Sequence, residues 1–365
     1  MSDAPSKQPS SSHWGQSSPS RRGHFELTHA VIAAAFRGVR SWGVWVDEHR
    51  VELHVLMRDA LAAIRPASTE TRHGLARWAR DEAGCDLVWS PAAGHTAIQG
   101  TTGSGKSSTL YSLLAPLAGR RDVIVCGSDV SGIVLEPWRT GPGDLIATGG
   151  TDLEDHARAL EDAVQVMTGR LGDLVATGRD LIACDEGMPW VVVVLEELPA
   201  LLAASRRDRE LHARITTAIR RLKQEGRKVG VVCVTTAQRM TAAVVDSDAR
   251  AQESVRITHR LDTTEALRLL HDGAHLPDIA EVRQWPPGLA LVEAPGRRLT
   301  RARADLTTYA DYRSAVAARV PVNLPATVEP IIATATTDAP PAKRRPQPKQ
   351  PRAKVTEPES PVPSG

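Results

Sequence analysis

The feature that most constrains this chain is a glycine-rich loop between a short apolar run and an amphipathic stretch. The loop reads Gly100-Thr-Thr-Gly-Ser-Gly-Lys-Ser107, a complete G-x-x-x-x-G-K-S pattern. It follows strand-like residues 95–99 and precedes a helix expected over 106–117. Glycines let consecutive backbone N–H groups point at phosphate oxygens, and the helix adds its positive N-terminal end. The sequence therefore predicts a phosphate-binding P-loop.

Two side chains of this loop have chemistry of their own. Lys106 would reach the β- and γ-phosphates, and the Ser107 hydroxyl would bind Mg²⁺. The alternative is a glycine-rich turn that only precedes a helix. The residues expected to bind the cofactor ATP are Gly100, Thr101, Thr102, Gly103, Ser104, Gly105, Lys106, Ser107 and Ser108.

Short apolar runs alternate with longer amphipathic stretches from residue 95 onward. Helices are expected over 153–174 and 209–224, and strands over 190–195 and 229–236. Strands separated by helices imply a parallel sheet joined by right-handed crossovers. Both strand runs are apolar without alternation, which is typical of central strands covered on both faces. The predicted fold class is α/β, with a mostly parallel central sheet flanked by helices.

The two ends of the chain differ from this pattern. Residues 1–25 are rich in Ser and Pro, and residues 321–365 form a Pro-rich basic tail; both are expected to be disordered because they have little to bury. Over 339–365, six basic residues face two acidic ones, a net charge of +4 in a chain of formal net charge +2. Such a tail can neutralise phosphates, or it can be a solvated segment without function.

Residues 26–82 have apolar positions near i, i+3 and i+4, with a break at Pro66. We therefore expect a small helical N-terminal region over 26–90, followed by the P-loop domain over 91–320.

Composition excludes several classes of protein. The four cysteines have neither zinc spacing nor a disulfide framework. The apolar run at residues 30–36 is far shorter than the about 20 residues that span a bilayer, and no signal peptide precedes it. We expect a cytoplasmic protein without an integral membrane segment.

A second motif is the apolar run 191–195 followed by Glu196 and Glu197. A P-loop enzyme needs one carboxylate at such a strand end for Mg²⁺ and another acid to polarise the attacking water. Glu196 fits the first role, as a metal ligand beside Ser107, and Glu197 fits the second. A solvated helix start with stabilising acids is the alternative.

A third motif ends the run 229–236, where Gln238 follows the strand. Its amide would contact the γ-phosphate or the attacking water. A glutamine at a strand end can also be simply exposed.

The order and wording of these motifs resemble the FtsK/SpoIIIE-type DNA translocases of the HerA–FtsK superfamily, over residues 94–314. The resemblance is carried by GHTAIQGTTGSGKSS, the paired acids before LPALL, EGRKVGVVCVTTAQR, VRITHRLDT and PPGLALVEAPGRRLTRARA. It implies a RecA-like domain that assembles as a hexameric ring. Such a ring moves double-stranded DNA through its pore by hydrolysing ATP with Mg²⁺.

The resemblance also implies roles for single residues. Lys106 and Ser107 become the Walker A pair, and Glu196 and Glu197 become the Walker B pair. Gln238 becomes the sensor.

Arg227 becomes the arginine finger that one subunit offers to its neighbour's nucleotide. Its alternative is one more solvated charge on a basic helix. Arg256 and Arg260 match the R-I-x-x-R strand of the family.

This chain departs from the family pattern, because Glu196 stands where Asp is usual and neither a membrane-spanning region nor a winged-helix module is recognisable. It is similar to stand-alone motors of actinobacterial plasmids and integrative elements, which suggests DNA transfer or partitioning of a mobile element, with a recruiting protein as a further partner. Two alternatives remain: a P-loop ATP-binding switch or assembly protein with weak hydrolysis, and a motor for a protein substrate.

Overall fold

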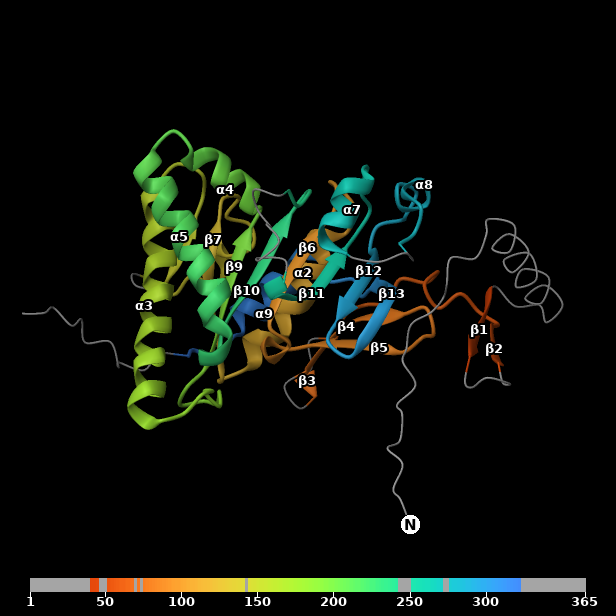
Figure 1. Cartoon of the computed structure of the whole chain (residues 1–365), viewed down its shortest axis with the longest axis horizontal. Coiled ribbons are helices and arrows are strands. Elements are labelled where there is room, and N and C mark those ends of the chain that lie inside the picture. Colours follow the sequence, from red (N-terminus) through yellow and green to blue (C-terminus); the bar gives the residue numbers. More distant parts are fainter. Residues whose placement is uncertain are drawn as a thin grey trace, which may run out of the picture. The chain divides into compact units, whose positions relative to one another are not determined.

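The computed structural model describes residues 40–45, 51–68, 71–72, 75–141, 144–241, 251–271 and 276–322. Their dominant feature is an eleven-stranded mixed sheet (Figure 1). One half of it is a block of parallel strands. Its members, in spatial order, are β8 (Ile146–Thr148), β7 (Val123–Asp129), β9 (Trp190–Glu196), β10 (Val231–Ala237), β6 (His95–Gln99) and β11 (Glu253–Thr258).

The other half of the sheet is antiparallel. It continues from β11 through β12 (Leu289–Ala294), β13 (Arg297–Ala304) and β4 (Leu75–Asp81), and β4 pairs with both β3 (Thr71–Arg72) and β5 (Asp86–Trp89). A separate hairpin joins β1 (Arg40–Trp45) to β2 (Val51–Leu56). The predicted α/β class with parallel central strands is thus confirmed.

Helices cover both faces of the parallel block. The chain passes from β6 to β7 through α2 (Lys106–Leu114). It then reverses its direction along the sheet. It reaches β9 through α3 (Leu153–Thr177), and β10 through α4 (Leu198–Ser205) and α5 (Arg209–Glu225). Right-handed crossovers running in opposite directions place their helices on opposite faces. Accordingly, α3 packs on β7 and β8, whereas α2 packs on β6 and on the terminal helix α9 (Tyr309–Ala317).

The remaining described elements are short. They are η1 (Pro91–Ala93), η2 (Ala115–Gly119), η3 (Glu136–Trp138), η4 (Gly226–Val229), α7 (Thr264–Leu270) and α8 (Ile279–Val282).

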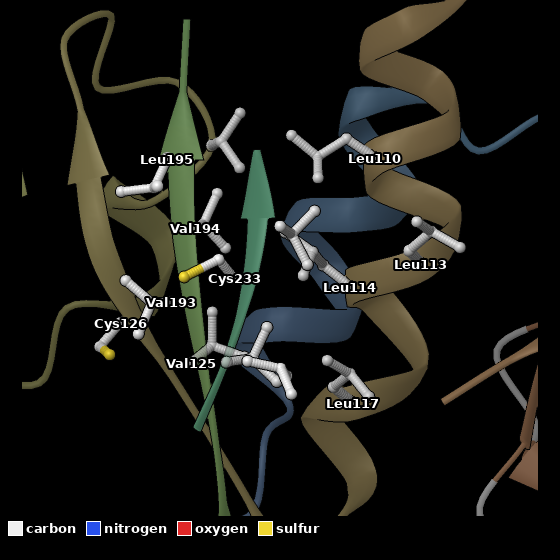
Figure 2. Packing of buried hydrophobic residues seen from close by; sticks show 14 of the residues in the cluster. Leu110, Leu113, Leu114, Leu117, Val125, Cys126, Val193, Val194, Leu195 and Cys233 are labelled. Atoms are coloured by element: carbon white, nitrogen blue, oxygen red, sulfur yellow. The ribbon is translucent and has the colours of Figure 1, made fainter. Parts of the chain in front are cut away.

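The core lies between the central strands and these helical layers. Val191 to Val194 of β9 are fully buried, as expected of a strand covered on both sides. Figure 2 shows Leu110 and Leu114 of α2 facing β9 and β10, beside Val194 and Cys233. This packing fixes α2 against the strands, and with it the loop from which α2 starts.

The prediction of a helical N-terminal region is wrong for those residues of the region that the structure describes. Residues 51–56 form β2 because Val51, Leu53 and Val55 alternate with polar residues, a period of two that the helical interpretation passed over. Residues 71–72, 75–81 and 86–89 also form strands. Since β4 pairs with β13, the sheet crosses the expected boundary at residue 90.

Several other expectations fall on residues outside this description: the helix-like stretch before residue 40, the disordered segment 1–25, and the tail beyond residue 322. In the described part of the chain, no helix is long and apolar enough to cross a membrane.

Candidate nucleotide-binding site

The phosphate loop runs from the end of β6 into the first turn of α2. Gly103 and Gly105 take positive φ angles of 71° and 102°. A Cβ on Gly105 would lie 2.4 Å from the backbone nitrogen of Gly288, so this position has neither the conformation nor the space for a side chain. Lys106 then opens the helix. The local geometry is the one expected from the G-x-x-x-x-G-K-S pattern.

Three neighbouring segments hold this loop through backbone hydrogen bonds. Gly100 N–H donates to the Ala237 carbonyl at 3.2 Å, and Thr101 N–H donates to the Arg260 carbonyl at 2.9 Å. Gly288 N–H donates to the Ser104 carbonyl at 2.8 Å. Because these hydrogen bonds come from three other segments of the chain, the surrounding structure fixes the backbone conformation of the loop.

Glu197 lies opposite the loop in a strained backbone conformation. It follows β9 and has a φ of 45°, the left-handed region that non-glycine residues rarely adopt. Its N–H donates to Thr236 Oγ1 at 3.0 Å. Its carboxylate accepts Lys106 Nζ at 2.7 Å and Gln238 N–H at 3.1 Å. In this conformation the carboxylate lies between the P-loop lysine and the residue that follows β10.

Glu196 has a different environment although it is the adjacent residue. It pairs in register with Asp129, the last residue of the neighbouring strand β7. Burial and the Asp129 carboxylate raise the pKa of Glu196 to about 7, with a smaller contribution from Glu197, while Lys106 opposes the rise. Two carboxyl groups therefore meet at one point of the sheet edge, where a cation would favour their ionised forms.

Asp129 is a residue of this site that the sequence analysis missed. It is fully buried, and its carboxylate accepts hydrogen bonds from the following loop. The donors are the N–H groups of Ser131, Gly132, Val134 and Leu135 and the Ser131 hydroxyl. The available signal was an acid ending an apolar strand at the carboxyl edge of a parallel sheet. These bonds give the loop after β7 a fixed shape.

The P-loop, the paired acids and the residue after β10 line one cleft of about 620 Å³. Its polar lining residues include Lys106, Ser107 and both acids, with Gln238 after β10. Its apolar lining residues come from α2 and from the loop after β7: Tyr111, Val130, Ile133 and Val134. A cleft lined by both kinds of residue suits a nucleotide, which has charged phosphates and a largely apolar base.

Most of the predicted site residues line this one cleft. Of the predicted loop residues, Thr101, Thr102, Gly103, Gly105, Lys106, Ser107 and Ser108 line it; Gly100 and Ser104 do not. Ser104 is part of the loop but is fully buried.

Arg227 lies at the opposite ends of the strands from the P-loop. Its Nε would be 3.7 Å from a Cβ on Gly94, which precedes β6, whereas the P-loop follows β6. A strand rises about 3.3 Å per residue, so residues 94 and 100 are roughly 20 Å apart. Arg227 is exposed there, and it does not line the cleft of its own chain.

The two arginines of the R-I-x-x-R strand have separate partners. Arg256 forms an ion pair with Glu293 at 3.3 Å. Arg260 donates to the Thr102 carbonyl at 3.2 Å, so its side chain supports the P-loop from outside the cleft.

The residues present fit a magnesium ion that arrives with a nucleotide. Ser107 is exposed in the cleft, and Glu196 offers a carboxylate whose raised pKa a cation would lower. Among the described residues, no group of three or more His, Cys, Asp or Glu side chains could hold a metal ion. Mg²⁺ commonly takes one or two protein oxygens and completes its shell with water and phosphate.

Strand order and site together define the class of protein. The P-loop follows β6, the paired acids lie at the end of β9, and β10, which Gln238 follows, lies between β6 and β9. This is a P-loop nucleoside-triphosphatase domain of the RecA-like kind. Residues 74–189 match the model of the FtsK/SpoIIIE family, which confirms the resemblance seen in the sequence.

Two named proteins are similar to longer stretches of this chain. The DNA translocase FtsK of Leptospira interrogans is 29% identical over 182 residues, which is 44% of this chain and 18% of that protein. A sporulation regulatory protein of Streptomyces azureus is 29% identical over 258 residues, 68% of this chain and 82% of that protein. This chain thus spans less than a fifth of the Leptospira translocase.

A solved structure shares the fold. The monomer form of the pCW3 conjugation coupling protein TcpA with ATPγS superposes with a TM-score of 0.59 at 18% identity, covering 80% of this chain and 85% of that one.

Proposed function

We propose that this protein is an ATP-dependent motor that moves double-stranded DNA and acts as a ring of six copies. The observation that carries the proposal is the cleft that Lys106, Glu197 and Gln238 line together, in a chain whose residues 74–189 match the FtsK/SpoIIIE family. A P-loop lysine, a fixed carboxylate and a polar strand end are the parts that phosphoryl transfer to water requires.

The residues of the cleft divide this work. Lys106 would bind the β- and γ-phosphates, which takes its ammonium group away from Glu197. Glu197 is then free to orient and deprotonate the attacking water, while its backbone stays fixed by Thr236. Gln238 lies beside Glu197 and would contact the same water or the γ-phosphate. Ser107 and Glu196 would hold Mg²⁺, which neutralises charge on the phosphates when it is bound.

The placement of Arg227 supports assembly as part of the mechanism. An exposed cation at the strand ends opposite the P-loop cannot reach the nucleotide of its own chain. A neighbouring copy in a ring could receive it instead. A guanidinium supplied in this way stabilises charge on the transferred phosphoryl group.

For the cellular task we propose DNA transfer or partitioning of a mobile element, in the cytoplasm and with a recruiting protein. The shared fold with a conjugation coupling protein is compatible with this task.

A second candidate is an ATP-binding switch that hydrolyses slowly. It is favoured by Glu196, because a carboxyl with a pKa of about 7 binds a cation less readily than an ordinary, ionised aspartate.

The test compares ATP hydrolysis with and without duplex DNA, and follows displacement of a third strand from a DNA triplex as the readout of translocation. Duplex DNA is expected to stimulate turnover, and the triplex is expected to dissociate only with ATP. Lys106→Ala is the control and should abolish both signals. Slow hydrolysis that ignores DNA would select the switch, and stimulation without triplex displacement would contradict translocation.

A further inference from the structure

Gln99, the last residue of β6, has a fully buried side chain in apolar surroundings. It shares one face of the strand with Ala97, because side chains two residues apart in a strand point the same way. Ala97 packs in a buried cluster with Met240, which follows β10, and with Leu270 of α7. Burying an amide at such a place costs free energy unless its polar atoms have partners.

Every polar atom of the Gln99 amide has a partner. Its Nε2 donates to Thr258 Oγ1 at 3.0 Å and to the Ala266 carbonyl at 2.9 Å. Its Oε1 accepts the Met240 N–H at 3.1 Å. A backbone carbonyl only accepts and a backbone N–H only donates, so these partners fix the orientation of the amide. His271 Nε2 lies 2.8 Å from Thr258 Oγ1 and holds that hydroxyl in place.

The bond to Met240 fixes the segment after β10 that carries Gln238. The start of this segment is fixed by the Ala237 carbonyl, which accepts the N–H of the residue after Gln99 at 3.2 Å. In its middle, the Gln238 N–H donates to Glu197 Oε1 at 3.1 Å. Gln238 is exposed, whereas Met240 is buried. The segment is therefore held at both ends and, between them, by a carboxylate of the cleft.

The middle bond conflicts with hydrolysis, and the end bonds do not. Glu197 has to turn toward the attacking water, so its bond to the Gln238 N–H competes with its proposed task. Gln99 does not line the cleft, and none of its polar atoms is needed by the nucleotide.

We propose that Gln99 is a positioning residue for hydrolysis. Through Met240, its amide keeps Gln238 in place when Glu197 turns to the water. The proposal rests on the proposed function insofar as Glu197 and Gln238 must act on bound ATP.

The first experiment measures ATPγS affinity and single-turnover ATP hydrolysis on the full chain. Gln99→Met keeps the length of the side chain but removes the acceptor for the Met240 N–H. Hydrolysis should fall about 10-fold to 100-fold, the scale of a misplaced catalytic group, while ATPγS affinity stays within about twofold. Gln99→Glu retains an oxygen for the Met240 N–H and should restore hydrolysis to within about threefold of the wild type.

Thr258→Val is the matched control. It removes the hydroxyl on the other side of the same amide and leaves the bond between Gln99 and Met240 intact. Hydrolysis should stay at the wild-type rate, even where the free energy of unfolding falls. A loss of hydrolysis equal to that in Gln99→Met would mean that general loosening of the network is the cause, and would overturn the proposal.

The second experiment asks whether Gln99 acts through Gln238. In the Gln238→Ala background, Gln99→Met should slow hydrolysis by no more than about twofold, because the group that it positions is already absent. Equal slowing in both backgrounds would overturn the proposal.

A third measurement uses the wild type and does not depend on how the variants fold. Residue-resolved hydrogen exchange compares the protein with and without ATPγS and Mg²⁺. With the nucleotide, the Gln238 N–H should lose protection while the Met240 N–H keeps it. Loss at both positions would contradict the anchoring by Gln99. Unchanged protection of Gln238 would contradict it too, because Glu197 would not have turned away.

Failure of this proposal is distinguishable from failure of the proposed function. A wild type that hydrolyses ATP beside an equally active Gln99→Met variant would overturn the role of Gln99 alone. ATPγS affinity that falls as much as hydrolysis in Gln99→Met would do the same, because the residue would then support the P-loop. If the wild type neither binds nor hydrolyses ATP, the proposed function fails, and the role of Gln99 fails with it.

Discussion

The Lys106 ammonium group and the Glu197 carboxylate form an ion pair, with Nζ 2.7 Å from Oε2. The two residues come from different strand ends, and each is the candidate for a separate catalytic task. Their side chains are 12% and 21% exposed, so the pair is shielded from water and stronger than a surface pair. A triphosphate must replace Glu197 as the partner of Lys106 before Glu197 can act on water.

Glu197→Gln should leave ATP binding intact, or slightly improve it, because Lys106 loses a competing carboxylate. Hydrolysis should fall about 10²-fold to 10⁴-fold, since the amide cannot accept the proton from water. ATPγS binding and single-turnover hydrolysis, measured side by side, check both expectations. Glu196→Gln is the matched variant. If it stops turnover while Glu197→Gln is mild, the two acids have exchanged their proposed roles.

Gly105→Ala should destabilise the loop, because this residue has a φ of 102° and its Cβ would lie 2.4 Å from Gly288 N. The expected result is a loss of ATP binding together with a lower free energy of unfolding, by about 1–3 kcal/mol. The matched control is Gly172→Ala, inside α3, where a Cβ would have nothing within 4 Å. It should stabilise the protein by about 0.5–1 kcal/mol and leave binding unchanged. Equal behaviour of the two variants would contradict the role of Gly105.

How far the sequence alone predicts this site depends on the distance between the interacting residues. The P-loop is a local pattern, so Lys106 and Ser107 could be placed from the sequence. The strained conformation of Glu197 depends on Thr236, 39 residues away, and had no local signal. Asp129 was overlooked because its importance comes from pairing in register with Glu196, which only the strand order reveals.

The N-terminal strands show the same limit for the fold. Apolar residues in the segment 51–64 satisfy both helical and alternating spacing, and the local sequence does not decide between them. Residues 75–81 pair with the nearby β5 and also with β13, a partner more than 200 residues away. Local periodicity carries no information on the distant partner, which joins these residues to the main sheet.

Stability without nucleotide should depend on pH through Glu196. Its pKa is raised from 4.5 to about 7, so between these values the folded state binds more protons than the unfolded state. The free energy of unfolding should therefore fall as pH rises from about 4.5 to about 7, by at most about 3 kcal/mol from this group. Denaturant unfolding in the presence of EDTA at pH 5 and pH 8 measures this change.

Glu196→Gln should remove that contribution, because the amide does not ionise. Its stability should exceed that of the wild type at pH 8 and approach it toward pH 5. An identical pH dependence of the two proteins would mean that Glu196 ionises normally despite its burial and the neighbouring Asp129.

Arg227→Ala should leave ATP binding nearly unchanged, because the arginine lies at the strand ends opposite its own P-loop. It should abolish DNA-stimulated hydrolysis, because the nucleotide of the neighbouring copy would lose its guanidinium group. Lys228→Ala is the matched control, since it removes the adjacent exposed cation and should remain active. The stronger test mixes Arg227→Ala with Lys106→Ala. Such rings contain some interfaces where an intact P-loop faces an intact Arg227, so part of the activity that neither variant has alone should return. Native mass spectrometry establishes that subunits have exchanged. If exchanged mixtures stay inactive while Arg227→Ala alone fails to bind ATP, the arginine acts within its own chain, and the proposed transfer between subunits is wrong.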